Sequence, residues 1–445
     1  MTNGTDNAAA ANPLDPAGSV LEKRVLYLFL FTQLFSNLLS RMVDVNLNVV
    51  PVAFLLFALI FALKKSGWTA VEVVCIATAT VFAVYVFDPR SRFSYNAMSI
   101  RDSVIPVLCL FVGVRVAAHG GRMVRFLNWM FLLFVGYGIA QELAFYSGSL
   151  GSILPWDAAW LQKMEEGGIW NIYQGPILRF FGVMNTFSEY QNYVAIVSTF
   201  LWFNAGMIKG VGRLVLLLNV LLAILFLGLS MERSPIALFL IVLGIWHVRH
   251  LGKKSARLLV CVVAGIAVVA AMLLSGLGEL EIDPRLSVAY KRLENVLTLN
   301  LAKDEAVQER LEKEWRTAAD LASEHYLGIG PGRVTQSAKD YERYVAPHNN
   351  FLMIFLAYGV VGLLLFGLLL VLILYQTTGL RSSLTYYSFG VTVGYCLLAI
   401  FNVPLTLKSG ILYFVIAGYL CGVASDRGTD GVAAADGAGE GEAAA

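Results

Sequence analysis

Four side chains are suited to phosphate and hydroxyl chemistry: Arg179, Arg233 and His348 border long apolar runs of the sequence, and Arg310 lies in a polar segment. A guanidinium group grips two phosphate oxygens at once and stays charged at any physiological pH. An imidazole accepts a proton from a hydroxyl nucleophile near neutral pH. Fixed arginines also stabilise a departing diphosphate without a metal ion. One histidine and three arginines therefore indicate a site for a phosphorylated lipid.

Two of the arginines also have plausible structural roles. Arg233 lies between two apolar runs with almost no loop to hold it in water, where a charge is costly unless it meets a polar cavity or a partner. The adjacent Glu232 could simply neutralise it. Arg310 precedes Glu314 by four residues, so an ordinary i,i+4 surface pair explains it equally well.

His348 and Arg179 each have a structural alternative too. Pro347 precedes His348 and could start the helix, which would place the imidazole in its first turn. In the structural alternative, an asparagine at 349 or 350 caps this helix and the histidine is merely interfacial. Arg179 stands at the edge of the next apolar run, where interfacial anchors are common.

Other catalytic patterns are missing from the sequence. Residues 325–332 (HYLGIGPG) contain three glycines, but no GK[ST] follows, and a helix rather than a strand precedes them. Asp44, Asp88 and Asp102 are isolated acids, and no D-x-D occurs. The five cysteines lie in apolar runs without a CxxC pair, which predicts buried small side chains. We expect no metal site and no cofactor.

The chain that must position these residues is an integral membrane protein. It has 445 residues, of which 58% are hydrophobic and 14% charged, whereas soluble proteins carry about 25% charged residues. The formal net charge is +2, which removes the basic excess expected of a nucleic-acid binder. No basic segment followed by an apolar core begins the chain, so we expect no cleavable signal peptide.

Apolar runs long enough for membrane helices predict an all-α polytopic fold with about twelve spans. The runs are 25–41, 48–63, 70–87, 104–118, 125–145, 187–207, 213–230, 234–249, 256–276, 349–375, 384–403 and 408–424. An even number of spans places both termini on one side of the membrane.

Basic residues are enriched in the cytoplasmic connections of membrane proteins. If the termini are cytoplasmic, fourteen basic residues lie in cytoplasmic connections and eight in external ones, so we place both termini in the cytoplasm. The cytoplasmic set is Lys23, Arg24, Lys64, Lys65, Arg115, Arg122, Arg125, Lys209, Arg213, Arg249, Lys253, Lys254, Arg257 and Arg381. The external set is Arg41, Arg90, Arg92, Arg101, Lys163, Arg179, Arg233 and Lys408.

This topology divides the chain into a membrane domain at 22–424 and two cytoplasmic tails, 1–21 and 425–445, whose compositions predict disorder. Two external segments result, 146–186 and 277–347. The second is long enough to be functional, and its pattern predicts a helix from Asp304 to about Tyr326 that ends before Gly328. The predicted fold is thus a bundle with a large, partly helical loop before the tenth span.

Three stretches, in this order and topology, resemble the O-antigen ligase and polymerase superfamily of bacterial envelope glycosyltransferases. The first is Arg179-Phe-Phe-Gly182 with Asn185 and Tyr190, and the second is Met231-Glu-Arg233-Ser-Pro. The third and most specific series is Arg310-x4-Trp315, Gly328-x-Gly330-x-Gly332, His348-Asn349-Asn350-Phe-Leu and Tyr358-Gly359-x-x-Gly362. One departure is Met231-Glu232, where the family more often has a small or hydroxyl residue.

The resemblance implies transfer of an oligo- or polysaccharide from undecaprenyl diphosphate to an acceptor hydroxyl in the periplasm, at the bacterial inner membrane. His348 would activate the hydroxyl or orient it, while Arg233 and Arg310 would hold the leaving diphosphate. The same resemblance puts five further residues in substrate binding: Arg179, Asn349, Trp315, Gly330 and Gly332. It implies inverting, metal-independent transfer, with an apolar cleft for the isoprenoid tail. External aromatic residues such as Trp156 and Trp160 would contact sugars.

Two members of this superfamily fit equally well on chemistry. A ligase uses lipid A-core as acceptor and a polymerase uses another lipid-linked glycan; we favour the ligase narrowly. A transporter of lipid-linked oligosaccharides is the alternative from another class, but it should show internal repeats, discontinuous spans or mid-span charges. No convincing repeat relates the first six spans to the last six. If the protein were a purely structural scaffold, the presence of an arginine at 233, between two apolar runs, would have no explanation.

Overall fold

The structure is a computed structural model, and it is all-helical apart from one short strand pair. It describes residues 16–439 except 46, 48, 64–67, 90–91, 118–120, 167–172, 175–176, 179–181, 185–186, 231–232, 251–309, 335–346, 381 and 402–407. The expected ninth span, 256–276, lies outside the described residues.

Eleven helices coincide with the other expected spans. They are α1 (Pro16–Val43), α2 (Val49–Leu63), α3 (Ala70–Val84), α4 (Phe93–Ala117), α5 (Gly121–Tyr146), α8 (Phe187–Phe203), α9 (Val211–Ser230), α10 (Arg233–His250), α15 (Asn350–Thr377), α16 (Ser382–Phe401) and α17 (Lys408–Gly439). Among the described residues, six segments are long and apolar enough to cross a membrane, in α1, α3 with the turn η1 (Tyr85–Phe87), α4, α5, α15 and α17. Four shorter apolar helices, α2, α9, α10 and α16, lie between them.

The two segments expected to be external also contain ordered elements. The segment 146–186 holds α6 (Leu150–Ile153), α7 (Pro155–Glu166) and a two-residue antiparallel pair, β1 (Tyr173–Gln174) with β2 (Ile177–Leu178). The later segment holds a π-helical turn, η5 (Arg310–Trp315), then α14 (Arg316–Glu324) and a short 3₁₀ turn, η6 (Pro331–Arg333). The predicted helix near 304–326 is therefore present from Arg310, and it ends just before Gly328 as expected.

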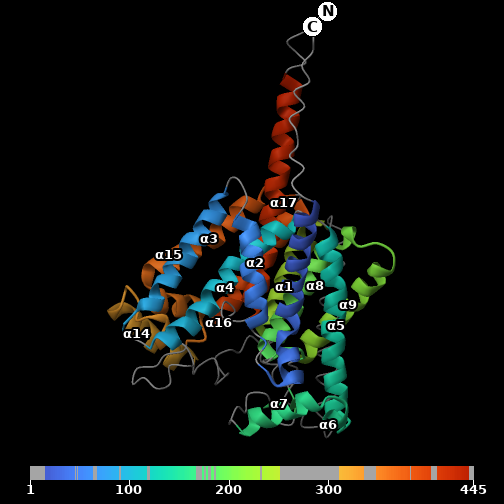
Figure 1. The fold of residues 1–445 in the computed structure, drawn as a ribbon, viewed down its shortest axis with the longest axis vertical. Helices are drawn as coiled ribbons and strands as arrows, with labels where there is room; N and C mark the ends of the chain where they lie inside the picture. Colours follow the sequence, from blue (N-terminus) through green and yellow to red (C-terminus); the bar gives the residue numbers. More distant parts are fainter. Residues whose placement is uncertain are drawn as a thin grey trace, which may run out of the picture.

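In Figure 1, α7 and α14 lie toward the lower end of the molecule, while α17 leaves at the upper end, where α1 and α5 also begin. The start of α1 and the end of α17 thus share one end of the bundle, as an even number of spans requires. Both helices reach past the boundaries expected for the membrane domain, since α1 begins at Pro16 and α17 runs to Gly439.

Helices α4 and α17 cross with their backbones nearly touching. A Cβ atom added to Gly418 would overlap the carbonyl of Leu110, and one added to Gly422 would lie 2.6 Å from the Cβ of Ala117. This spacing of two glycines four residues apart is the small-residue motif that lets membrane helices pack closely through van der Waals contact. Because the pair joins the fourth and last expected spans, it closes the bundle.

A kink interrupts α15, which the sequence had predicted as one continuous span. Gly359 adopts φ +68°, a left-handed conformation inside an otherwise helical segment. The backbone amide of Val360 donates to the carbonyl of Tyr326 at 2.9 Å, outside the helix. The kink therefore opens α15 to the loop that follows α14.

Candidate active site

His348 stands at the start of α15, at the end of the molecule that also carries α14. The side chain of Asn349 caps this helix, since its Oδ1 accepts hydrogen bonds from the backbone amides of Phe351 and Leu352, both at 3.0 Å. Capping of this kind fixes where the chain enters the helix. Asn349, predicted to bind substrate, thus lies beside the histidine and is 7% exposed, with its amide oxygen engaged by the backbone.

The carboxylate of Glu314 holds His348 through two contacts. Its Oε2 atom lies 2.8 Å from the Nδ1 atom of the imidazole and accepts a hydrogen bond from the backbone amide of His348 at 3.2 Å. The histidine side chain is 38% exposed and the glutamate side chain 29%. Because an ionised carboxylate only accepts hydrogen bonds, a neutral imidazole in this arrangement would carry its proton on Nδ1 and leave the lone pair on Nε2.

This contact gives Glu314 a partner besides the i,i+4 neighbour Arg310 that the spacing suggested; the side chain of Arg310 lies outside the described part of the structure. Glu314 is turned toward a residue 34 positions away in sequence rather than serving only its own helix. The contact between Glu314 and His348 joins two stretches of the predicted motif series, Arg310-x4-Trp315 and His348-Asn349. Arg310 begins the π-helical turn that ends at Trp315 and therefore belongs to the same short element as Glu314.

Helix α14 packs along the first turns of α15 and leaves an apolar groove between them. Its small residues Ala318 and Ala322 are buried, which lets the two helices approach. The groove has a volume of about 390 Å³ and begins next to His348, at Asn349. It is lined by Ala319, Ala322, Asn349, Phe351, Leu352, Phe355 and Leu363.

The glycine-rich loop after α14 packs into the kink of α15. Gly328 has φ +84°, and a Cβ atom there would lie 2.7 Å from the backbone nitrogen of Gly359. The amide of Ile329 donates to the carbonyl of Leu356 at 2.6 Å. These contacts leave no room for side chains at 328 or 359, so the two glycines interlock the loop with the helix that carries His348.

Gly330 and Gly332, predicted to bind substrate, are buried in protein contacts. Gly330 has φ +93° and lies against the carboxylate of Asp88. The amide of Gly332 donates to Oδ1 of Asn96 at 3.1 Å, and Nδ2 of Asn96 donates to the carbonyl of Asp88 at 3.0 Å. The structure thus gives both glycines a part in joining the loop to the corner between α3 and α4.

Arg179 lies outside the described residues, but Gly182 of the same motif is fixed in a buried polar network. Nη2 of Arg41 donates to the carbonyl of Gly182 at 2.6 Å, and the amide of Gly182 donates to Oε1 of Gln141 at 3.0 Å. Gly182 has φ +49° and packs on the ring of Tyr190, another residue of that motif. The network therefore holds the corner three residues beyond Arg179.

The centre of this network is a buried ion pair between α1 and α7. Nη1 of Arg41 lies 3.1 Å from Oδ1 of Asp157, and the two side chains are 3% and 0% exposed. The other carboxylate oxygen accepts from Tyr137 at 2.7 Å and from Gln141 at 2.6 Å. Burial raises the pKa of the Asp157 carboxyl, and the charge of Arg41 and these hydrogen bonds oppose that rise.

Trp156 and Trp160, expected to contact sugars, support the same network. Nε1 of Trp156 donates to the hydroxyl of Tyr137 at 2.8 Å, and the guanidinium of Arg41 lies 5.5 Å from the ring centre of Trp160. A second buried cation lies on α17, where Nζ of Lys408 donates to Oγ of Ser36 at 2.8 Å. Sequence reasoning counted Arg41 and Lys408 only as external charges, because nothing local marks them as buried.

Arg233, which comes from the second of the three motif stretches, is the first residue of α10. The structure describes the backbone of Arg233 and of Arg310 but not their side chains, so the convergence of the three arginines on His348 stays a prediction. Within the described residues, no three His, Cys, Asp or Glu side chains gather as a metal site would require.

The fold and this site define a polytopic membrane protein with a histidine–carboxylate pair at one end of its bundle. The O-antigen ligase family model matches residues 218–367, from α9 to beyond the kink of α15. The matched segment contains Arg233, Arg310, Glu314 and His348, whereas Arg179 precedes it. This match confirms the resemblance to the O-antigen ligase superfamily found in the sequence. No match was found among curated proteins.

Proposed function

We propose that this O-antigen ligase and polymerase type membrane enzyme is a ligase, which transfers an oligo- or polysaccharide from undecaprenyl diphosphate to a hydroxyl of lipid A-core. The reaction takes place at the periplasmic face of the inner membrane, and both termini of the chain are cytoplasmic. The observation that carries the proposal is the contact between His348 and Glu314, inside the segment that matches the family.

In the proposed reaction, Nε2 of His348 accepts the proton of the acceptor hydroxyl. The hydroxyl oxygen then forms a bond to the anomeric carbon while the bond from that carbon to the diphosphate oxygen breaks. The proton remains on the imidazole until it passes to solvent, and the undecaprenyl diphosphate leaves with the electron pair. Single displacement of this kind inverts the anomeric configuration. Glu314 is a positioning residue, because its contact with Nδ1 keeps the basic nitrogen on the side of the acceptor.

The leaving diphosphate needs positive charge that is already in place. We assign this role to Arg233 and Arg310, with Arg179 near the lipid phosphate or the entry of the glycan. Arg310 begins the turn that carries Glu314, so a diphosphate bound by Arg310 would lie close to the imidazole. Fixed guanidinium groups in a site shielded from water stabilise developing negative charge without a metal ion.

The groove between α14 and α15 suits the first isoprene units of the donor. It begins at Asn349, next to the proposed base, and the remaining side chains of its lining are apolar. Burial of apolar area stabilises a bound lipid by about 25 cal/mol per Å², which favours a branched hydrocarbon over water in this groove.

The test is a reconstituted reaction of purified protein with undecaprenyl-diphosphate glycan and lipid A-core. We expect a conjugate that forms in the presence of EDTA and fails to form with His348→Ala. Longer lipid-linked chains without conjugate would identify a polymerase instead. Movement of labelled lipid-linked glycan between leaflets, with neither product, would identify a transporter and overturn the proposal.

A further inference from the structure

A second groove, separate from the candidate active site, lies at the opposite end of the bundle. It has a volume of about 580 Å³ and runs between α1, at residues 23–31, and the first turns of α5. These helices begin at the upper end of Figure 1, whereas α7 and α14 lie toward the lower end. Across the groove the rings of Tyr27 and Phe126 meet with their centres 4.9 Å apart.

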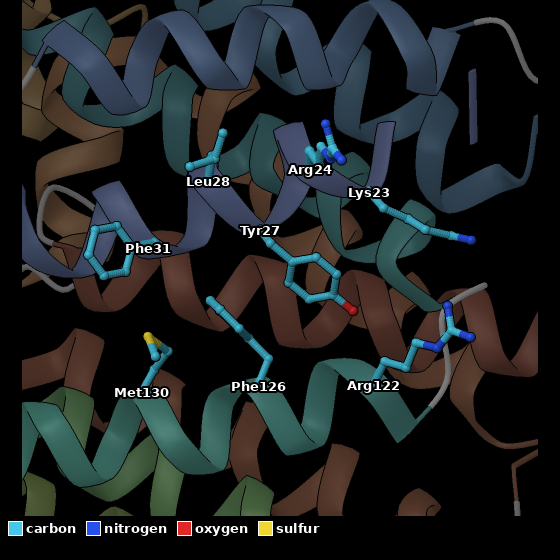
Figure 2. Close-up of a pocket in the computed structure, with 8 residues that line it drawn as sticks. All are labelled: Lys23, Arg24, Tyr27, Leu28, Phe31, Arg122, Phe126 and Met130. Atoms are coloured by element: carbon cyan, nitrogen blue, oxygen red, sulfur yellow. The ribbon is translucent and has the colours of Figure 1, made fainter. Parts of the chain in front are cut away.

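The groove is cationic at one end and apolar at the other. Lys23 and Arg122 extend toward the same end, Arg24 stands near them, and Phe31 and Met130 stand at the far end (Figure 2). On both helices, the basic residues come first in the sequence and the apolar residues follow. On each of them, the basic residue lies about eight positions before the apolar one, which is roughly 12 Å along a helix.

The three cations of this groove lack acidic partners within the described part of the chain. The nearest acid in sequence, Glu22, is taken by Arg115, with its Oε1 atom 2.7 Å from both Nε and Nη2 of that arginine. Lys23, Arg24 and Arg122 make no described ion pair or hydrogen bond. Three like charges held together repel one another, and a bound anion relieves that repulsion.

We infer that this groove binds one anionic glycerophospholipid of the cytoplasmic leaflet. The phosphate would lie among Lys23, Arg24 and Arg122, with the hydroxyl of Tyr27 beneath them. One acyl chain would lie along Phe126 toward Phe31 and Met130. A free phosphate ion would leave this apolar half uncovered, whereas a zwitterionic lipid would bring its own cation to the basic end. Both the charge and the apolar length of the groove therefore favour a lipid with net negative charge.

The experiment measures which lipid the purified protein retains. The protein is placed in nanodiscs with equal amounts of phosphatidylglycerol and phosphatidylcholine, and native mass spectrometry counts the lipid that stays bound. We expect preferential retention of phosphatidylglycerol. Each basic residue near a membrane surface is worth about 1 kcal/mol toward an anionic lipid, so Arg122→Gln should weaken retention about fivefold. The triple variant K23Q/R24Q/R122Q should weaken it on the order of 100-fold.

Matched variants separate this site from a general effect of positive charge. Lys209 and Arg213 are exposed and belong to the same predicted cytoplasmic set, so K209Q/R213Q should leave retention unchanged. Met130→Trp fills the apolar end without altering charge, and it should reduce retention even if the charge variants insert poorly. Equal retention of the two lipids, equal loss in K209Q/R213Q, or complete displacement by millimolar inorganic phosphate would overturn the inference.

Discussion

At the residue scale, one carboxylate determines what His348 does. An imidazole exposed at a helix start can adopt either neutral tautomer and is free to rotate, whereas Glu314 engages both Nδ1 and the backbone amide of the same residue. The ring orientation is thereby fixed, and the tautomer with a lone pair on Nε2 is favoured. A general base needs both a fixed ring orientation and a lone pair on the nitrogen that accepts the proton.

Replacing Glu314 tests this positioning role. Glu314→Gln is expected to lower kcat by roughly 10² or more with little change in KM, because an amide that donates to Nδ1 favours the wrong tautomer. Glu312 is exposed on the same turn, so Glu312→Gln should match the wild type in both kcat and KM. A rise in KM with kcat unchanged would mean that Glu314 does not position the base.

Arg41 and Asp157 illustrate how burial changes the value of an ion pair. Asp157→Asn removes one charge from a pair that is 3% and 0% exposed and leaves Arg41 buried beside a neutral amide. Loss of one partner from such a pair costs about 3–5 kcal/mol, so the melting temperature in detergent should fall clearly. Asp44 pairs with Lys163 at 2.8 Å, but these side chains are 84% and 63% exposed. Asp44→Asn should therefore leave the melting temperature unchanged, and an equal fall in both variants would contradict this account.

At the element scale, the site depends on the interlock between the glycine-rich loop and α15. The loop enters where Gly359 breaks the helix, and the hydroxyl of Tyr85 donates to the carbonyl of Leu327 at 2.7 Å. The ring of Phe82 stacks on Tyr358 at 4.0 Å between ring centres, one residue before the kink. Helix α3, the loop and α15 thus form one unit, and His348 and Asn349 stand at its open end.

Gly359→Ala tests the interlock. The added Cβ atom would lie 2.6 Å from the carbonyl carbon of Leu327, at a φ of +68° that L-residues rarely adopt. Backbone strain alone costs about 1–3 kcal/mol, so we expect a lower melting temperature and reduced transfer activity. Gly367 lies in the same helix, and a Cβ atom there would meet nothing within 4 Å. Gly367→Ala should therefore behave as the wild type; similar effects of the two substitutions would refute the interlock.

Periodicity and apolar length were enough to predict eleven of the helices, because each span must satisfy its own backbone hydrogen bonds in the membrane. The sequence also indicated His348, and it placed an ordered helix before Gly328. It did not predict the kink at Gly359, since an apolar run around a glycine has the same composition whether the helix is straight or broken. Nor did it predict the contact of Glu314 with His348, for a related reason. A contact over 34 positions depends on how two elements pack, and local spacing favours the i,i+4 neighbour.

At the scale of the whole molecule, the two ends of the bundle have different chemistry. One end carries α7, α14, the start of α15 and the buried pair of Arg41 and Asp157, and it holds the candidate site. The other end carries the groove between α1 and α5, where Lys23, Arg24 and Arg122 make no ion pair within the described part of the chain. This division fits an enzyme that acts on lipid-linked substrates at one membrane face and contacts anionic lipid at the other.

The central claim is that His348 is the base in glycosyl transfer, and the most direct test is a single-turnover rate. Purified protein loaded with undecaprenyl-diphosphate glycan is mixed with lipid A-core, and conjugate formation is followed for wild type, His348→Ala and His325→Ala. His325 is an exposed histidine at the end of α14, and it serves as the matched control. Loss of a general base costs about 10²–10⁴ in rate, so we predict a fall of that size in His348→Ala alone. A His348→Ala rate within a fewfold of wild type would contradict the account.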